Sequence, residues 1–183
     1  AVHRLLGLPA PDAGAAQLTI QTDGPTASEE AESIAAILAA SGGAVRLAVD
    51  DAEADLLWRI RRSMHPAMET LGTALIEDVS VPRSALPDMF DEIARIERAY
   101  GLGIPTVCHA GDGNLHPNFI VEGPEVPDHV WEAAGELFQA ALRLGGTLTG
   151  EHGVGILKRR WLADELGPDQ WELQRAITRV FDP

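Results

Sequence analysis

The chain has 183 residues, of which 45% are hydrophobic, and a formal net charge of −14. This length predicts one domain, or two small ones, with enough apolar residues for a core. The acidic balance argues against a nucleic-acid groove or an anionic membrane surface as the partner. A small anionic substrate stays open, because a few local cations are enough to bind one. A single cysteine excludes a disulfide framework.

The N-terminus contains no apolar run that is long enough for a membrane span, and no signal peptide is visible. We therefore expect a cytoplasmic protein without a transmembrane segment. The chain does not begin with Met, which indicates a cleaved or partial chain.

The first part of the chain is predicted to alternate strands and helices. A capping box at Thr26-Ala-Ser-Glu29 begins a helix that ends before Gly42-Gly43. Asp50-Asp51 begins a second helix, which Pro66 should end or kink. Strands are predicted on either side of the first helix, at residues 17–22 and 44–49.

The second part has the pattern of split βαβ units. The predicted elements are a strand at 74–81, a helix at 84–100 capped by Ser84, a hairpin of strands 106–109 and 115–121, a helix at 127–144, a short strand at 147–149, and a helix at 158–180 broken near Gly167-Pro168. This order favours an α+β fold, in which an antiparallel sheet has helices packed on one face.

The hairpin carries the residues that point most directly to chemistry, in the run Cys108-His-Ala-Gly-Asp-Gly-Asn-Leu-His-Pro-Asn118. A four-residue loop at 111–114 would place His109 opposite His116, on one face, with Cβ atoms about 5 Å apart. Two imidazoles at that separation can share one metal ion, and Asn118 lies on the same face. Cys108 points to the other face and is expected to be a packing residue. Asp112 and Asn114 suit the turn itself, where such residues form local hydrogen bonds.

A second motif, Gly150-Glu-His-Gly-Val-Gly155, follows about one helix later. Its glycines indicate a cramped backbone that directs the side chains between them. The residues alone leave two assignments open. Either Glu151 is a metal ligand beside His152 as a base, or His152 is the third ligand and Glu151 orients it. Adjacent residues in an extended chain point in opposite directions, so we do not expect both to ligate.

Cationic residues that suit an anionic substrate lie elsewhere in the chain. Arg59, Arg61 and Arg62 share one predicted helix, where they form either a solvated face or a bidentate carboxylate site. Lys158 is either an anion contact or a charge at a helix end. His65, near the end of the arginine-bearing helix, is a further candidate for the same pocket.

These motifs resemble the C-terminal domain of FAD-linked 2-hydroxy-acid dehydrogenases. This family includes the glycolate oxidase flavin subunit, D-lactate dehydrogenase and D-2-hydroxyglutarate dehydrogenase. The resemblance spans nearly the whole chain in the family's order, and it implies the family's ferredoxin-like cap domain over residues 1–183. The matching segments are Leu57-Trp58 with Arg61, Glu77-Asp-Val-Ser-Val-Pro82, the hairpin run, Gly150 to Gly155 with Lys158, and Phe181-Asp-Pro183.

The resemblance implies a role for each candidate residue. It assigns metal binding, with zinc the expected ion, to His109, His116 and Glu151, and it makes His152 the catalytic base. It further implies that Arg61 holds the substrate carboxylate, that Asn118 and His65 contact substrate, and that Asn114 and Lys158 contact FAD.

The implied reaction is oxidation of a small D-2-hydroxy acid to the 2-oxo acid, with hydride transfer to FAD. Some members have a lysine for a second carboxylate where this chain has Ile76, which favours lactate or glycolate as substrate. The family's FAD-binding domain and the tail after Asp182-Pro183 are absent from these residues. We therefore expect a fragment that binds metal but is inactive alone, and a homodimer is possible. Neither the electron acceptor nor the metal follows from the sequence. Two alternatives are a flavin-independent metal-dependent hydrolase or lyase, and a non-catalytic metal-binding domain.

Overall fold

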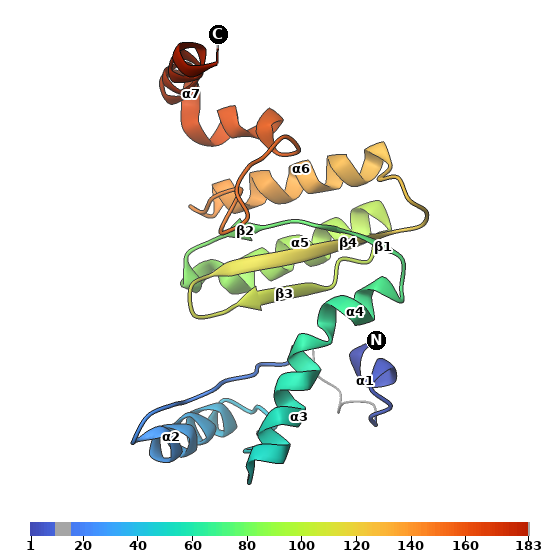
Figure 1. Ribbon diagram of the computed structural model, residues 1–183, viewed down its shortest axis with the longest axis vertical. Helices are drawn as coiled ribbons and strands as arrows, with labels where there is room; N and C mark the ends of the chain where they lie inside the picture. The colour runs from blue at the N-terminus through green and yellow to red at the C-terminus, as the bar shows by residue number, and fades with distance from the viewer. Residues whose placement is uncertain (10–15, 183) are drawn as a thin grey trace. The chain divides into compact units, whose positions relative to one another are not determined.

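The computed structural model describes residues 1–9 and 16–182, and the chain divides into two compact units, Ala1–Thr70 and Leu71–Pro183 (Figure 1). That residues 1–183 form one cap domain stays a prediction. Over the described residues, no helix combines the length and the apolar character that crossing a membrane requires.

The first unit is helical. It contains α1 (Val2–Leu5), α2 (Ala27–Ala40), α3 (Asp51–Arg62) and α4 (Met64–Glu69). Val2, Ile60 and Ala67, from three of these helices, form a small buried cluster. The strands predicted at 17–22 and 44–49 are wrong, because neither segment forms a described strand. Their alternation is present, but a strand also needs a hydrogen-bonded neighbour.

The helix ends of the first unit partly follow the prediction. Asp50 caps α3, because its side chain accepts a hydrogen bond from the Glu53 N–H. The predicted capping box of α2 is wrong, since Thr26 Oγ1 donates to the Glu30 carboxylate and caps no N–H. The predicted helix from Asp50 is interrupted at Ser63. Pro66 lies in the first turn of α4, where its missing N–H is harmless.

The second unit is built on an antiparallel sheet, which confirms the α+β prediction. β4 (Asn114–Val121) is the central strand, with β3 (Thr106–His109) along one edge. β1 (Thr73–Ile76) and β2 (Val79–Ser80) lie along the other edge and keep one register, from Thr73 opposite Val121 to Ser80 opposite Asn114. The predicted strand 74–81 is therefore present, but it is interrupted at Glu77 and Asp78.

The remaining elements complete a β-α-β-β-α order. A short 3-10 helix (Arg83–Ala85) leads into α5 (Leu86–Tyr100), so the cap is Ala85 and the predicted Ser84 cap is wrong. After α6 (Asp128–Arg143), the predicted strand 147–149 is reduced to a single bridge between Thr147 and Ser80. A second 3-10 helix (Arg159–Trp161) precedes α7 (Leu162–Phe181), which is kinked as predicted at Gly167, where φ is 73°.

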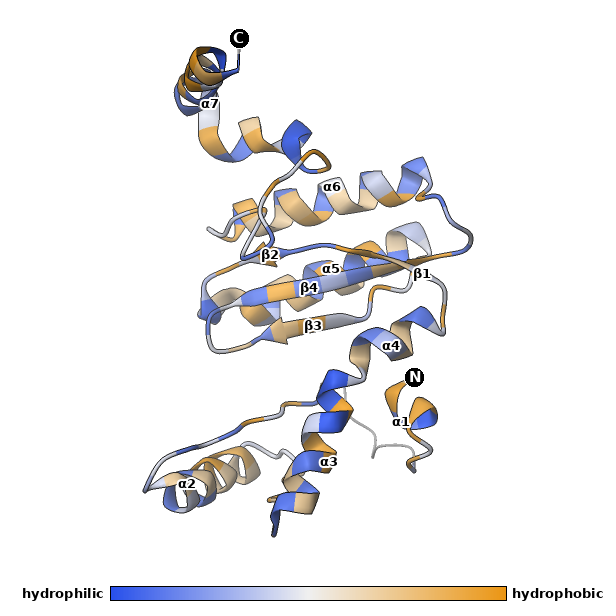
Figure 2. Ribbon diagram, in the orientation of Figure 1, coloured by the Kyte–Doolittle hydropathy of each residue, from blue (hydrophilic) through white to orange (hydrophobic). Residues whose placement is uncertain are grey.

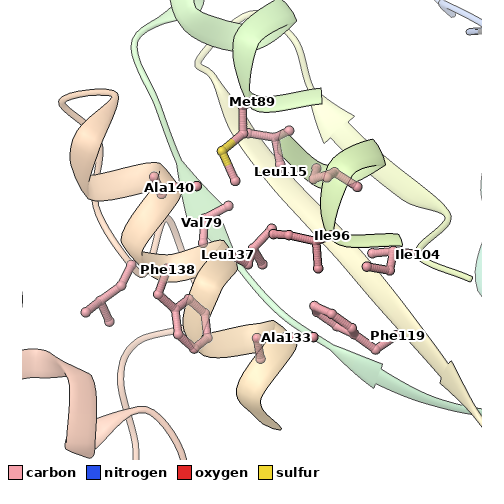
Figure 3. Close-up of a cluster of buried hydrophobic side chains, with 14 of the residues drawn as sticks. Val79, Met89, Ile96, Ile104, Leu115, Phe119, Ala133, Leu137, Phe138 and Ala140 are labelled. Carbon is pink, nitrogen blue, oxygen red and sulfur yellow. The ribbon is translucent and has the colours of Figure 1, made fainter. Parts of the chain in front are cut away.

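The core lies between the sheet and helices α5 and α6. Figure 3 shows Met89 and Ile96 of α5 and Leu137 of α6 packed near Leu115 and Phe119 of β4. All five are fully buried. Hydrophilic and hydrophobic residues alternate along α6 (Figure 2), so this helix offers one apolar face to the core. Cys108 packs against the same core, as expected from its place in the hairpin. The opposite face of β4 carries the polar residues Asn114, His116 and Asn118, followed by Ile120.

Candidate metal centre

The hairpin brings His109 and His116 together, but in a different register from the predicted one. His109 pairs with Asn114, and Val107 pairs with His116, so the two histidines are not directly opposed. The turn closes earlier than predicted, because the N–H groups of Asp112 and Gly113 both donate to the His109 carbonyl. A shift of two positions in the pairing preserves the faces. The two imidazole rings therefore still meet, edge to face, with centroids 5.3 Å apart.

Glu151 completes a cluster with the two histidines. Its Oε1 atom lies 3.0 Å from His116 Nε2 and 3.9 Å from His109 Nε2. One potential ligand atom from each residue lies within 4.8 Å of the other two. Two imidazoles and one carboxylate are a donor set of catalytic zinc sites, which keep a fourth position for water or substrate. His109 and Glu151 are exposed and His116 is half-buried, so the cluster fits a divalent cation that a small molecule can reach.

His152 lies beside this cluster. Its ring stacks on His116, with centroids 4.9 Å apart and planes 18° from parallel. Its Nε2 atom is 3.8 Å from Glu151 Oε1. Of the two assignments left open above, this geometry favours Glu151 as the third ligand, with His152 as the neighbouring base.

The protonation of His116 suits metal binding. Burial lowers the pKa of its imidazole, and the neighbouring His152 and His109 lower it further, against the opposing effect of Glu151 and Asp78. An imidazole must be neutral to ligate a metal. The lowered pKa therefore favours the neutral form that ligation requires.

Asp78 is a residue of this site that sequence reasoning missed. It is fully buried in the interruption between β1 and β2. Its carboxylate accepts hydrogen bonds from the backbone N–H groups of Gly150, Glu151 and His152. The available signal was the pair Glu77-Asp78, which places two carboxylates inside a predicted strand whose other residues, except Ser80, are apolar.

The two asparagines predicted as contacts are both buried on this face. Asn114 Nδ2 donates to Asp78 Oδ1 at 3.0 Å. Asn118 Nδ2 donates to the Pro105 and His116 carbonyls. Their side-chain oxygens have no hydrogen-bond partner among the residues that the structure describes. These oxygens are the atoms that each residue can still offer to a ligand.

Lys158 is buried, and its amine is used within the chain. Nζ donates to the carbonyls of Asp78 and Leu148, at 2.6 and 3.0 Å, and lies 3.3 Å from Glu77 Oε2. These contacts favour a structural role. Contact between Lys158 and FAD stays a prediction.

The predicted substrate residues of the first unit are Arg61 on α3 and His65 on α4. Arg61 is half-buried, and His65 is exposed with Nε2 3.4 Å from Glu69 Oε1. Because they belong to the other compact unit, their roles toward substrate stay predictions.

Comparison with known proteins places the chain in a family. The family model described as "FAD linked oxidases, C-terminal domain" matches residues 1–183. The chain is 38% identical over 179 residues to the glycolate oxidase subunit GlcD of Bacillus subtilis (strain 168), which covers 94% of this chain and 38% of that protein.

An archaeal relative is also similar. The D-lactate dehydrogenase of Archaeoglobus fulgidus is 36% identical over 160 residues, which covers 85% of this chain and 34% of that protein. The glycolate oxidase subunit GlcD of Escherichia coli (strain K12) is 33% identical over 159 residues, which covers 85% of this chain and 32% of that protein. The chain thus spans between 32% and 38% of the length of these relatives. Together with the α+β fold, these matches show that the chain belongs to the family of C-terminal domains of FAD-linked oxidases.

Proposed function

We propose that this chain is the substrate- and metal-binding part of an FAD-dependent dehydrogenase that oxidises a small D-2-hydroxy acid to the 2-oxo acid. The observation that carries the proposal is the cluster of His109, His116 and Glu151 with His152 stacked beside it. The names of its relatives, glycolate oxidase and D-lactate dehydrogenase, support the same class of substrate.

The proposed metal ligands are His109 Nε2, His116 Nε2 and a Glu151 carboxylate oxygen. When bound, a divalent cation such as zinc supplies a positive charge that lowers the pKa of a nearby hydroxyl, and FAD accepts the two electrons of the oxidation. The donor nitrogens of Asn114 and Lys158 are used within this chain. We therefore propose that most contacts with FAD come from outside these residues.

The remaining steps belong to the chain's own side chains. Oxidation of a 2-hydroxy acid removes the hydroxyl hydrogen as a proton and the hydrogen on C2 as a hydride, which carries both electrons. The hydride would pass to FAD. We assign the hydroxyl proton to His152, whose exposed ring can accept it and release it to solvent. The substrate carboxylate is assigned to Arg61, whose guanidinium can bind it through two hydrogen bonds. His65 and Asn118 are assigned further substrate contacts.

The sheet favours a substrate with one carboxylate. Ile76 pairs with Asn118 across β1 and β4, and it is 37% exposed. Alternation places both side chains on the face that carries His116. An apolar side chain at this position offers no charge to a second carboxylate, so we propose glycolate or lactate in preference to a dicarboxylic acid.

The first test is the metal content of the purified chain, measured by elemental analysis. We expect about one divalent ion per chain, and its loss in the double variant His109→Ala/His116→Ala. The matched control, His3→Ala/His129→Ala, removes two histidines outside the cluster and should keep the ion. Equal metal content in the two variants would contradict the assigned ligands.

The second test is turnover of glycolate and D-lactate by a flavin-loaded protein that contains this chain. His152→Ala and Arg61→Ala should each lower kcat/KM by more than tenfold, which corresponds to about 1.4 kcal/mol. Unchanged kcat/KM in both variants would overturn the proposed roles. Hydrolytic or lyase turnover without flavin would favour the alternative enzyme class. Stabilisation by metal with no further effect of 2-hydroxy acids would favour a non-catalytic metal-binding domain.

A further inference from the structure

We infer that Asp78 is a positioning residue, which holds the loop Thr149-Gly-Glu-His152 so that Glu151 and His152 face the two hairpin histidines. The inference rests on the proposed function, because it assigns Asp78 a part in building the same site. Asp78 itself neither ligates the metal nor contacts substrate in this assignment.

The loop is anchored to a single oxygen atom. Asp78 Oδ2 accepts the N–H groups of Gly150, Glu151 and His152 at 2.8, 3.0 and 2.9 Å. It also accepts the Thr149 hydroxyl at 2.9 Å. Three consecutive N–H groups that converge on one anion fix the direction of the backbone between them. The side chains of Glu151 and His152 leave from this fixed backbone.

The loop has no room to shift toward the sheet. A Cβ atom on Gly150 would lie 1.8 Å from Asn114 Nδ2 and 2.9 Å from Asp78 Oδ1. Asn114 in turn donates to Asp78 Oδ1 and so fixes the orientation of the carboxylate. The glycine is therefore needed for close approach, and the asparagine supports the anchor.

A second contact holds the chain just before the loop. Lys158 Nζ bridges the carbonyl of Asp78 and the carbonyl of Leu148. The backbone at Asp78 is thus connected through the Lys158 amine to Leu148, which precedes the loop. Since the loop itself belongs to no helix or strand, these contacts replace the regular hydrogen bonds that would otherwise hold it.

The charge of Asp78 is retained despite its burial. Its two oxygens accept hydrogen bonds from the Asn114 amide, the Thr149 hydroxyl and the three loop N–H groups. A buried carboxylate is expensive unless its hydrogen bonds are satisfied. Asp78 meets this condition only while the loop stays in its present conformation.

Asp78 also faces the side of His116 that is turned away from the cluster. Its Oδ1 atom lies 3.9 Å from His116 Nδ1, whereas His116 Nε2 faces Glu151 at 3.0 Å. His116 Nδ1 is buried and has no hydrogen-bond partner among the described residues, so Asp78 acts on this side of the ring through its charge alone. This arrangement agrees with an outer position for Asp78.

The test compares Asp78→Ala and Asp78→Asn with the matched control Asp112→Asn. The Asp112 carboxylate lies in the hairpin turn and accepts a hydrogen bond from the Asn114 N–H. The first readout is hydrogen exchange of the amides of Gly150, Glu151 and His152 in the metal-free chain. We expect their exchange to rise at least tenfold in Asp78→Ala and less in Asp78→Asn, which keeps the shape and one acceptor oxygen. It should not change in Asp112→Asn.

The second readout is the Kd for Zn²⁺, which should weaken about 10- to 100-fold in Asp78→Ala. The decisive measurement is a double-mutant cycle between Asp78→Asn and Glu151→Gln. If Asp78 acts through the position of Glu151, its substitution should weaken Zn²⁺ binding much less when Glu151 is already changed. A merely structural role would give the same loss in both backgrounds.

The outcomes separate this inference from the proposed function. Unchanged amide exchange in Asp78→Ala, or an undiminished effect on Kd in the Glu151→Gln background, would overturn the positioning role while the metal site stands. A wild-type chain that binds no Zn²⁺ would overturn the proposed metal site. In that case, faster exchange confined to the three loop amides would still support Asp78 as the anchor of the loop, and unchanged exchange would overturn it.

Discussion

The two faces of strand β4 bury different kinds of side chain. On one face, Leu115, Phe119 and Val121 are at most 4% exposed and belong to the main hydrophobic cluster. On the other face, Asn114 and Asn118 are 6% and 2% exposed, but each leaves its side-chain oxygen without a partner in the described part of the chain. An unpaired buried polar atom costs about 1–3 kcal/mol. The first face therefore stabilises the fold, and the second keeps polar atoms that stability alone does not require.

The same contrast separates two adjacent carboxylates. Glu77 and Asp78 interrupt one strand, and alternation directs them to opposite faces. Burial is the largest single influence on both carboxyls, and by itself it would raise the pKa of each. Lys158 offsets only part of this for Glu77, whose pKa stays raised, whereas several hydrogen-bond donors lower the pKa of Asp78 to about 2. Directed N–H groups thus stabilise a buried charge on the polar face more effectively than one amine does on the other.

The largest expected effect is on the apolar face. Phe119→Ala should lower the free energy of unfolding by about 3–5 kcal/mol, because it removes a fully buried ring from a packed core. Urea denaturation measures the loss. The matched control is Phe90→Ala on α5, where the side chain is 38% exposed, and it should cost much less. Equal losses in the two variants would contradict the assignment of the core to this face of the sheet.

Removing the buried amine of Lys158 should give the second-largest loss of stability. Lys158→Met leaves the Glu77 carboxylate and two carbonyls without their donor, and removing one partner of a buried ion pair costs about 3 kcal/mol or more. The double variant Glu77→Gln/Lys158→Met should recover part of the loss in urea denaturation, because no unpaired charge remains. A Lys158→Met variant with normal stability and weakened FAD binding would instead support the flavin contact predicted from the sequence.

Sequence reasoning succeeded where a local pattern determines the structure. The apolar periodicity of α5 and α6, the kink at Gly167 and the meeting of His109 with His116 all followed from local spacing. The exact pairing of the hairpin did not, because it depends on which N–H groups close the turn on the His109 carbonyl. The faces survived this error because a shift by two positions preserves them.

Long-range contacts were the main source of error. Residues 17–22 and 44–49 alternate like strands, yet they form no described strand, since alternation does not supply a neighbour. Asp78 was missed because its partners lie 71 to 74 positions away in the sequence. No spacing rule connects residues that far apart. The ligand roles of the cluster stay predictions until metal is measured.

Acid should reduce the contribution of Asp78, on the polar face, to the free energy of unfolding in a defined pH range. The pKa of Asp78 lies near 3.8 in an unfolded chain and about 2 in the fold. Its contribution is therefore complete above about pH 5 and is lost as the pH falls toward 2, by about 2 kcal/mol in total. We expect the difference in unfolding free energy between wild type and Asp78→Asn, measured with urea on metal-free protein, to shrink between pH 5 and pH 3. A difference that stays constant over this range would show that the charge of Asp78 does not contribute.

The smallest expected effect lies on the outside of the helix layer. Arg95 Nη2 on α5 lies 2.9 Å from Glu136 Oε2 on α6 and 3.1 Å from Glu92 Oε2, but the arginine side chain is 44% exposed. Arg95→Gln should therefore cost less than about 1 kcal/mol in urea denaturation. The cost should shrink further in about 1 M salt, where charges are screened over about 3 Å. Arg175→Gln, which breaks a pair within α7 only, is the matched control and should cost no more. A loss as large as that of Lys158→Met would mean that exposed pairing between the helices, and not the apolar face of β4, holds this layer in place.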